Sequence, residues 1–186
     1  AGLKRATTLV AAAEHSIGNT EAPRSARKEI RNLLEDYEGY KKRMDELMEE
    51  IEKTLSEIPY IDKLMEITGI GIKTVSCFIA EVGDIGRFDN PKQVQKLAGY
   101  AIVADSSGKH NGESRISHRG RKRLRYALYE SAISVIGKNK EFKEIHSYYR
   151  TREKNPLKKM QSLIVIACKT LRGIYTILKP EAVKTR

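Results

Sequence analysis

The sequence contains no tryptophan, few aromatic residues and only two cysteines. Aromatic residues make up 6% of the 186 residues, so the hydrophobic core is expected to be aliphatic. Cys77 and Cys168 each lie in an apolar helical pattern. Two such cysteines indicate buried, reduced thiols of an intracellular, cytoplasmic protein rather than a disulfide framework. No run of about 18 uncharged apolar residues occurs, so we expect no membrane-spanning segment.

The motifs of several enzyme classes are also missing. The sequence has no Gly-rich nucleotide loop, no paired His or Cys at metal-ligand spacing and no carboxylate cluster in a predicted cleft. We therefore expect neither a metal site nor a cofactor in this chain. The N-terminus is a poor signal-peptide candidate because Glu14 and His15 interrupt its apolar stretch. The absence of an initiator Met predicts a fragment of a longer protein.

Helix-forming residues are abundant, and they predict an all-α fold. Residues 1–18 are expected to be helical, and a second helix to run from Ala26 to Ile58. Its apolar residues recur every three or four positions, a heptad pattern over about 50 Å of helix. A stripe this long needs a partner, which is either a second subunit or residues 3–17 folded back as an antiparallel hairpin. The residues of the stripe are Ala26, Ile30, Leu33, Tyr37, Tyr40, Met44, Leu47, Ile51, Leu55 and Ile58.

These patterns divide the chain into two parts. Residues 1–58 are expected to form a helical, coiled-coil dimerisation segment, and residues 59–186 a compact helical domain. Charge divides in a similar way. Residues 1–90 contain 13 Lys or Arg and 17 Asp or Glu, a net charge of −4, whereas residues 91–186 contain 22 and 7, a net charge of +15. A basic half of this kind predicts a polyanionic partner, and nucleic acid is the foremost candidate.

A short glycine-containing turn follows Pro59. Thr68-Gly69-Ile70-Gly71 separates two short predicted helices, as in a helix-hairpin-helix motif. Its glycines would let the backbone approach a phosphate, the amides of the second helix would donate to it, and Lys73 would add a charge-assisted contact. The alternative is a simple tight turn.

The segment SSGKHNGESRISHRGRKRLR, from Ser106 to Arg125, is the most distinctive in the chain. Two serines precede a glycine, and a polar loop over 105–120 leads into a helix from Arg121 to Ile136. A hydroxyl on a turn among fixed cations suits attack on a phosphodiester. Six basic residues within eleven positions are candidate phosphate contacts: Arg115, Arg119, Arg121, Lys122, Arg123 and Arg125.

Three helices are expected to close the domain. The stripe of the first, over 121–136, consists of Leu124, Leu128, Ala132 and Val135. The second spans 139–153 with Phe142, Ile145, Tyr148 and Tyr149 facing inward. The third spans 156–178 and presents Leu157, Met160, Leu163, Ile164, Ala167, Cys168, Leu171 and Ile174 to the core.

The order of these motifs resembles a known family. GIGIKTVSCFIAEVGDIGRFDNPKQVQKLAGY followed by SSGKHNGESRISHRGRKRLRYAL is similar to the C-terminal domain of the DEDD-type insertion-sequence transposases, which are relatives of the Piv and MooV DNA invertases. The preceding long helix and the AAAEHSIG stretch also look like that family. The similarity therefore extends over most of the chain.

This resemblance implies an enzyme that recombines DNA at specific sites. In the family, four acidic residues of an RNase H-like domain bind metal, and a second domain supplies a serine nucleophile. The position of that serine matches Ser107 in this chain. Ser106 is the remaining alternative. The resemblance also implies Mg²⁺ bound by the RNase H-like domain, which is missing from this chain, and a structured guide RNA in many members.

The chain departs from the family pattern at Ser117-His118, where a Ser-Lys pair is usual. A serine needs activation, and Asp105, His110 and His118 are the ionisable residues near it in sequence. Two other functions compete with that of an enzyme: a non-catalytic nucleic-acid-binding module and an oligomerisation scaffold. The uneven charge argues against a scaffold alone, which would need no positive field.

Overall fold

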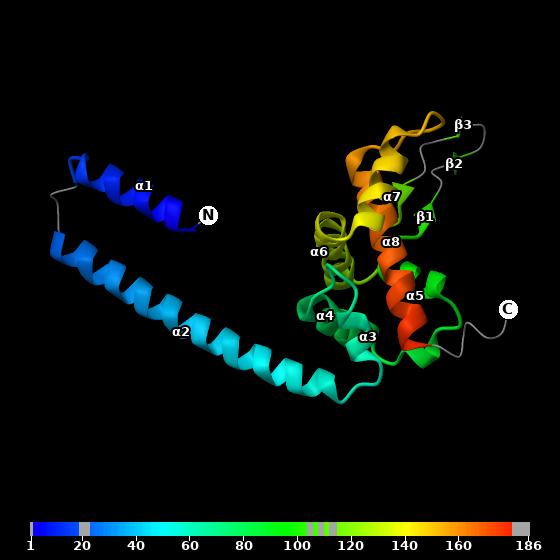
Figure 1. Ribbon diagram of the computed structural model, residues 1–186, viewed down its shortest axis with the longest axis horizontal. Helices are drawn as coiled ribbons and strands as arrows, with labels where there is room; N and C mark the ends of the chain where they lie inside the picture. The colour runs from blue at the N-terminus through cyan, green and yellow to red at the C-terminus, as the bar shows by residue number, and fades with distance from the viewer. Residues whose placement is uncertain (1, 19–22, 104–105, 108–109, 112–114, 180–186) are drawn as a thin grey trace. The chain divides into compact units, whose positions relative to one another are not determined.

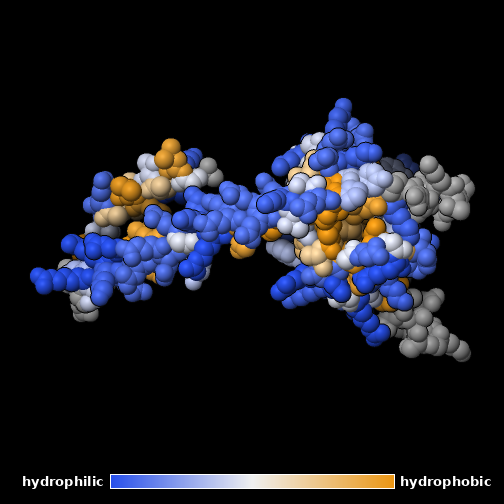
Figure 2. Space-filling view, turned by 90° about the horizontal axis from the view of Figure 1, so that it is seen from below, coloured by the Kyte–Doolittle hydropathy of each residue, from blue (hydrophilic) through white to orange (hydrophobic). Residues whose placement is uncertain are grey.

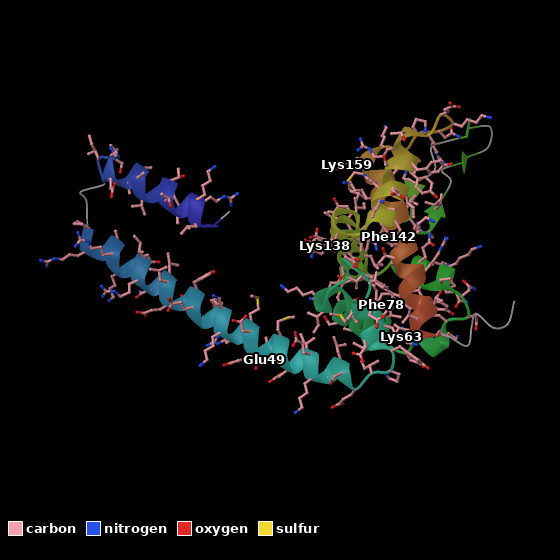
Figure 3. The ribbon with its side chains drawn as sticks, viewed as in Figure 1. Glu49, Lys63, Phe78, Lys138, Phe142 and Lys159 are labelled. Carbon is pink, nitrogen blue, oxygen red and sulfur yellow. The ribbon has the colours of Figure 1, made fainter. Side chains whose placement is uncertain are left out.

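The computed structural model describes residues 2–18, 23–103, 106–107, 110–111 and 115–179, the two short pairs by their backbone alone. Within these residues the chain forms eight α-helices, one 3-10 helix and four strands of two residues each (Figure 1). The predicted all-α fold is confirmed. The contacts divide the chain into residues 1–49 and residues 50–186. The division falls at Glu49, labelled in Figure 3, inside the long second helix.

The first unit contains α1 (Gly2–Glu14) and most of α2 (Pro23–Ser56). Every described residue of α1 is exposed, so α1 does not cover the apolar stripe of α2 within the single chain. Figure 2 shows apolar patches among the charged surface of these helices. The exposed fractions of the stripe are 58% for Ile30, 58% for Leu33, 66% for Tyr37, 67% for Tyr40, 52% for Met44 and 58% for Leu47.

The last two turns of α2 belong to the second unit. Leu55 is 5% exposed, and Ile51 and Ile58 pack against the same core. The heptad stripe is therefore continuous in sequence, but its residues differ in exposure. Its C-terminal end is buried in the core of the second unit, whereas its centre is exposed to solvent in the single chain. The predicted division between residues 58 and 59 stays a prediction.

Six further α-helices build the second unit around an aliphatic core. The predicted stripe of α6 is confirmed, since Leu124, Leu128, Ala132 and Val135 are each 0% exposed. Phe78, labelled in Figure 3, is 1% exposed. The elements are α3 (Ile61–Met65), α4 (Ile72–Val82), the 3-10 helix η1 (Ile85–Arg87), α5 (Pro91–Leu97), α6 (Lys122–Lys138), α7 (Lys140–Thr151) and α8 (Lys159–Leu178).

Several details differ from the sequence-based expectation. The last helix begins at Lys159 rather than at residue 156, because Lys158 has an extended backbone (φ −63°, ψ 156°) and serves as the N-cap, with its amide donating to the side chain of Gln161. Tyr148 and Met160 were expected to face inward, but they are 62% and 53% exposed. Both lie at helix surfaces that the described residues leave largely uncovered.

Helix α8 is long and apolar enough, by length and composition alone, to cross a membrane, and it is the only described helix of which this is true. Half of that stretch is buried inside the unit. Two of its buried residues, Ile166 and Leu171, are 0% exposed. This is the position of a core helix, and length and composition by themselves are weak support for a membrane span.

The prediction of a polar loop over 105–120 was wrong in one respect, because short strands form within that range. Strand β1 (Ile102–Val103) pairs antiparallel with β4 (Arg115–Ile116), and β2 (Ser106–Ser107) pairs antiparallel with β3 (His110–Asn111). We call these four strands (residues 102–103, 106–107, 110–111 and 115–116) the hairpin arm. The residues of β1 are apolar, whereas those of β2 and β3 are polar and show no apolar alternation, so only the cross-strand pairing identifies β2 and β3 as extended.

Two glycines fix the base of the hairpin arm against the end of α5. Gly120 has φ of 147°, and a Cβ there would overlap the carbonyl oxygen of Leu97 and lie 2.7 Å from the amide nitrogen of Gly99. The amide of Arg121 donates to the carbonyl of Leu97 at 2.7 Å, and that of His118 to Gly99 at 3.2 Å. The start of α6 is thus held in place by backbone contacts that a larger residue at position 120 would break.

Candidate nucleic-acid interface

The structure brings the six predicted phosphate contacts together where the hairpin arm meets α6. We call these residues the basic cluster. Arg115 lies on β4, Arg119 lies in the connection between β4 and α6, and the other four lie at the N-terminal end of α6. All are exposed except Arg125, which is partly buried. The cluster consists of Arg115, Arg119, Arg121, Lys122, Arg123 and Arg125.

The members of the basic cluster differ in what they contact. The Nη1 atom of Arg121 lies 3.6 Å from Oε2 of Glu81. Nη1 of Arg125 donates to the carbonyls of Ala98 at 3.3 Å and His118 at 3.1 Å, and Arg115 also has an interaction of its own. Arg125 therefore acts mainly to position the connection. The exposed cations left to meet a phosphate are Arg119, Lys122 and Arg123.

The position of these cations on α6 is unfavourable for the helix itself. The first turn of α6 contains no acidic residue, and its N-cap, Arg121, makes no side-chain cap hydrogen bond. The positive end of the helix dipole and the adjacent cations repel one another. A bound anion would relieve that repulsion, and the unpaired amides of a helix N-terminus are suitable donors to a phosphate. This end of α6 is therefore a candidate anion site, although Glu81 already offsets part of the charge of Arg121.

The predicted nucleophile, Ser107, lies on the hairpin arm, where its backbone pairs with His110. It is five residue steps along the chain from Ile102, which limits the distance between their Cα atoms to about 18 Å. The side chains of Ser106, Ser107 and His110, and the whole of Asp105, lie outside the described residues. The choice of nucleophile and of base therefore stays a prediction. His118 is exposed and adopts a left-handed backbone with φ of 53°.

The glycine turn between α3 and α4 has a clear packing function. Gly69 has φ of 99°, and a Cβ there would lie 2.6 Å from Cα of Val135 on α6. Helix packing accounts for this glycine without a ligand. Gly71 is the N-cap of α4 with open space around it, and Lys73 is exposed. Their predicted contact with a phosphate stays a prediction.

The glycine turn and the basic cluster lie at opposite ends of α6. Gly69 contacts Val135, while Glu81 at the other end of α4 pairs with Arg121, so α4 and α6 run antiparallel. Fourteen residues of helix separate Arg121 from Val135, or about 21 Å at 1.5 Å per residue. The predicted site residues therefore form two groups rather than one.

The two thiols have ordinary structural positions. Burial raises the pKa of Cys168 to about 11. Burial, and then the charge of Glu81, raise the pKa of Cys77, which is only partly buried. The expectation of a buried thiol is thus confirmed for Cys168 but not for Cys77. Both groups are protonated near neutral pH and are poor nucleophiles.

A second hydroxyl, that of Ser162, has a geometry that resembles part of a catalytic pair. Its Oγ lies 2.8 Å from Nδ1 of His146. Ser162 is 0% exposed, however, and no substrate can reach it. The contact instead joins α7 to α8. Over the described ranges, no group of three or more His, Cys, Asp or Glu side chains is placed to hold a metal ion.

Sequence reasoning missed a surface pocket of about 380 Å³ beside the basic cluster. Its wall on α6 includes Lys122, Tyr126 and Tyr129. Their spacing of four and then three residues places them on one helix face, which is the signal that could have revealed it. Tyr126 is 64% exposed, so its ring is not part of the core.

Residues 61–150 match the model of the transposase IS116/IS110/IS902 family. The matched span is slightly less than half of the chain. It begins with α3 and ends within α7, so it includes the hairpin arm and the whole basic cluster. The match supports a transposase of this type. A search of curated proteins found no match.

Proposed function

We propose that this chain is the DNA-binding, serine-bearing part of an insertion-sequence transposase. The observation that carries the proposal is that the hairpin arm bearing Ser107 and the basic cluster meet at the N-terminal end of α6, inside the span that matches the family. Cations and helix amides would bind the phosphates of a DNA strand there. The hydroxyl of Ser107 would then act on one of those phosphates.

The proposed reaction is a phosphoryl transfer. Oγ of Ser107 attacks the phosphorus, the Oγ–P bond forms, and one ester bond between phosphorus and a deoxyribose oxygen breaks. The serine proton passes to a base, and the departing deoxyribose oxygen is protonated. Because one phosphate ester replaces another, the covalent serine–DNA intermediate keeps the bond energy that rejoining requires.

Activation of the serine is proposed to require a second domain. A serine hydroxyl is a weak nucleophile by itself. Metal held by the acidic residues of an RNase H-like domain would neutralise charge on the phosphate. A structured guide RNA is a further proposed partner, and the positive field of residues 91–186 suits either nucleic acid.

A non-catalytic nucleic-acid-binding and dimerisation module is the second candidate. The basic cluster and the exposed stripe of α2 support this function without any nucleophile. DNA strand cleavage by the intact protein distinguishes the two, since a module of this kind would bind DNA and leave it whole.

The isolated 186-residue chain is expected to bind duplex DNA without cutting it. The cations needed for binding are present, whereas the proposed metal-holding domain is not. A gel-shift titration and a denaturing gel of the same reactions, with Mg²⁺ present, measure the two properties together. Failure to bind at about 50 mM salt would contradict the proposed function, and cleavage would contradict the need for a second domain.

The exposed stripe of α2 is proposed to pair with the same stripe of a second subunit. Met44 and Leu47 lie at its centre and are 52% and 58% exposed in the single chain. Changing both to Asp should weaken the dimer at least about 100-fold, because four buried apolar side chains per dimer would be replaced by charges. Sedimentation velocity between about 1 and 100 μM measures the effect.

A matched control adds the same two negative charges outside the stripe. Ser25→Asp together with Asn32→Asp changes positions that lie off the heptad seam of α2. This control is expected to leave the dimer unchanged. A wild-type chain that is monomeric at 100 μM would show that the stripe has another partner.

A further inference from the structure

The pocket beside the basic cluster has no part in the function proposed above. It lies where α6, α8 and the base of the hairpin arm come together, and it has a volume of about 380 Å³. This volume is within the ~300–1,000 Å³ range of pockets that bind small organic groups. Its walls include Tyr126 and Tyr129 of α6, Met160 of α8 and Ile116 of β4.

The walls of the pocket are suited to a flat aromatic group. Tyr126 is 64% exposed and Met160 is 53% exposed, so neither is needed to complete the core. The hydroxyl of Tyr129 lies 3.7 Å from the sulfur of Met160, which brings the α6 and α8 walls into contact. Exposed tyrosine rings next to cations are the usual platform on which nucleic-acid bases stack.

The charges around the pocket select for an anion attached to that group. His118, Lys122 and Arg125 line it, and among the residues that the structure describes no Asp or Glu does. Arg125 is engaged with backbone carbonyls, which leaves the exposed Lys122 as the lining Lys or Arg available to a ligand. A flat apolar ring joined to a phosphate is the chemistry of a nucleotide.

We propose that this pocket holds one unpaired base of a nucleic-acid strand whose backbone runs over the basic cluster. The proposal rests on the proposed function, since it needs the strand to be bound there. The base has to be unpaired because a base inside a duplex is stacked on both faces and cannot enter a side-chain pocket. The strand is DNA or RNA, which share this chemistry.

The position of the pocket gives such a base a definite use. Ile116 lines the pocket and pairs with Ile102 across the hairpin arm, and Ile102 is within about 18 Å of Ser107 along the chain. A base fixed in the pocket would set which phosphate of the strand lies near the serine. The pocket would thus fix the register of the strand and add to the affinity for a single strand, while duplex DNA would be bound through the basic cluster alone.

The test uses the full 186-residue chain and short single strands that carry 2-aminopurine, a fluorescent base whose emission falls when it stacks on an aromatic ring. DNA and RNA strands of one sequence, with the 2-aminopurine moved one position at a time, are compared with the corresponding DNA duplex. Tyr126→Ala should weaken single-strand binding about tenfold, remove the quenching and change duplex binding less than twofold. Tyr126→Phe should behave like the wild type, because the ring is kept.

Tyr148→Ala is the matched control, because Tyr148 is 62% exposed on α7 and does not line the pocket. Met160→Glu alters the opposite wall and should also weaken single-strand binding, which keeps the test decisive if Tyr126→Ala fails to fold. The strand bound more tightly, DNA or RNA, identifies the source of the base.

The outcomes separate this proposal from the proposed function. Unchanged single-strand binding by Tyr126→Ala and Met160→Glu, with duplex DNA still bound, would overturn the pocket alone. An equal loss for duplex and single strand, or the same loss in Tyr148→Ala, would also overturn it. If the wild-type chain bound neither form of nucleic acid, the proposed function would fail as well.

Discussion

Replacing Ser107 by Ala in a transposase that also carries the RNase H-like domain should lower DNA strand cleavage roughly 10⁴-fold or more, while DNA affinity stays within about twofold. The alanine removes the only atom proposed to bond to phosphorus. It leaves the basic cluster and the α6 N-terminus, which are proposed to bind the strand, unchanged. Cleavage of labelled element-end DNA and the trapped covalent protein–DNA adduct measure the first quantity, and a gel-shift titration measures the second.

The neighbouring serine provides the control for this experiment. Ser106 and Ser107 are adjacent on β2, and the resemblance to the family matches the nucleophile to Ser107 rather than to Ser106. Ser106→Ala is therefore expected to keep most of the activity. If Ser106→Ala lost cleavage and Ser107→Ala kept it, the nucleophile would be Ser106. Full cleavage by both variants would remove the serine mechanism and leave the non-catalytic candidate.

Changing Arg119, Lys122 and Arg123 together to Gln should weaken DNA binding by the 186-residue chain roughly 100- to 1,000-fold at moderate salt. These are the exposed members of the basic cluster that are not engaged with Glu81 or with backbone carbonyls. Each lost phosphate contact should also reduce the slope of log K against log salt by about one. The loss should be similar for unrelated DNA sequences, because phosphate contacts carry no base information.

A charge-matched control separates a local site from a general positive surface. Lys143, Arg150 and Lys154 are exposed residues on or just after α7. Changing these three to Gln removes the same total charge and should reduce affinity less than about fivefold. Equal losses in the two triple variants would mean that DNA is attracted by net charge alone and that the basic cluster is no specific interface.

Local patterns in the sequence predicted most of the helices correctly. The spacing of Leu124, Leu128, Ala132 and Val135 identified the buried face of α6, and Asn90-Pro91 marked the start of α5, where the Asn90 side chain accepts from the amides of Lys92 and Gln93. These features depend on residues within one or two turns of each other. Their physical causes, side-chain periodicity and capping, act over the same short range.

Errors arose where a local pattern depended on a distant neighbour. Tyr148 and Met160 match the helical spacing of core residues, yet they are 62% and 53% exposed. Gly69 follows the pattern of a phosphate-binding turn, yet its missing side chain also allows contact with Val135, 66 positions further along the chain. Periodicity predicts which residues share a helix face, but it does not predict which element packs against that face or whether the face is exposed to solvent.

The sequence by itself determined the all-α class, the heptad stripe of α2, the concentration of positive charge after residue 90 and the identity of the six basic residues. Only the tertiary structure decided that Arg121 pairs with Glu81, that Arg125 supports a backbone connection, and that Tyr126 borders a pocket beside them. Composition and spacing are fixed along the chain. The partner of a charged or aromatic side chain, in contrast, depends on which distant backbone segments pack together, and this decides whether it stabilises the fold or remains exposed for a ligand.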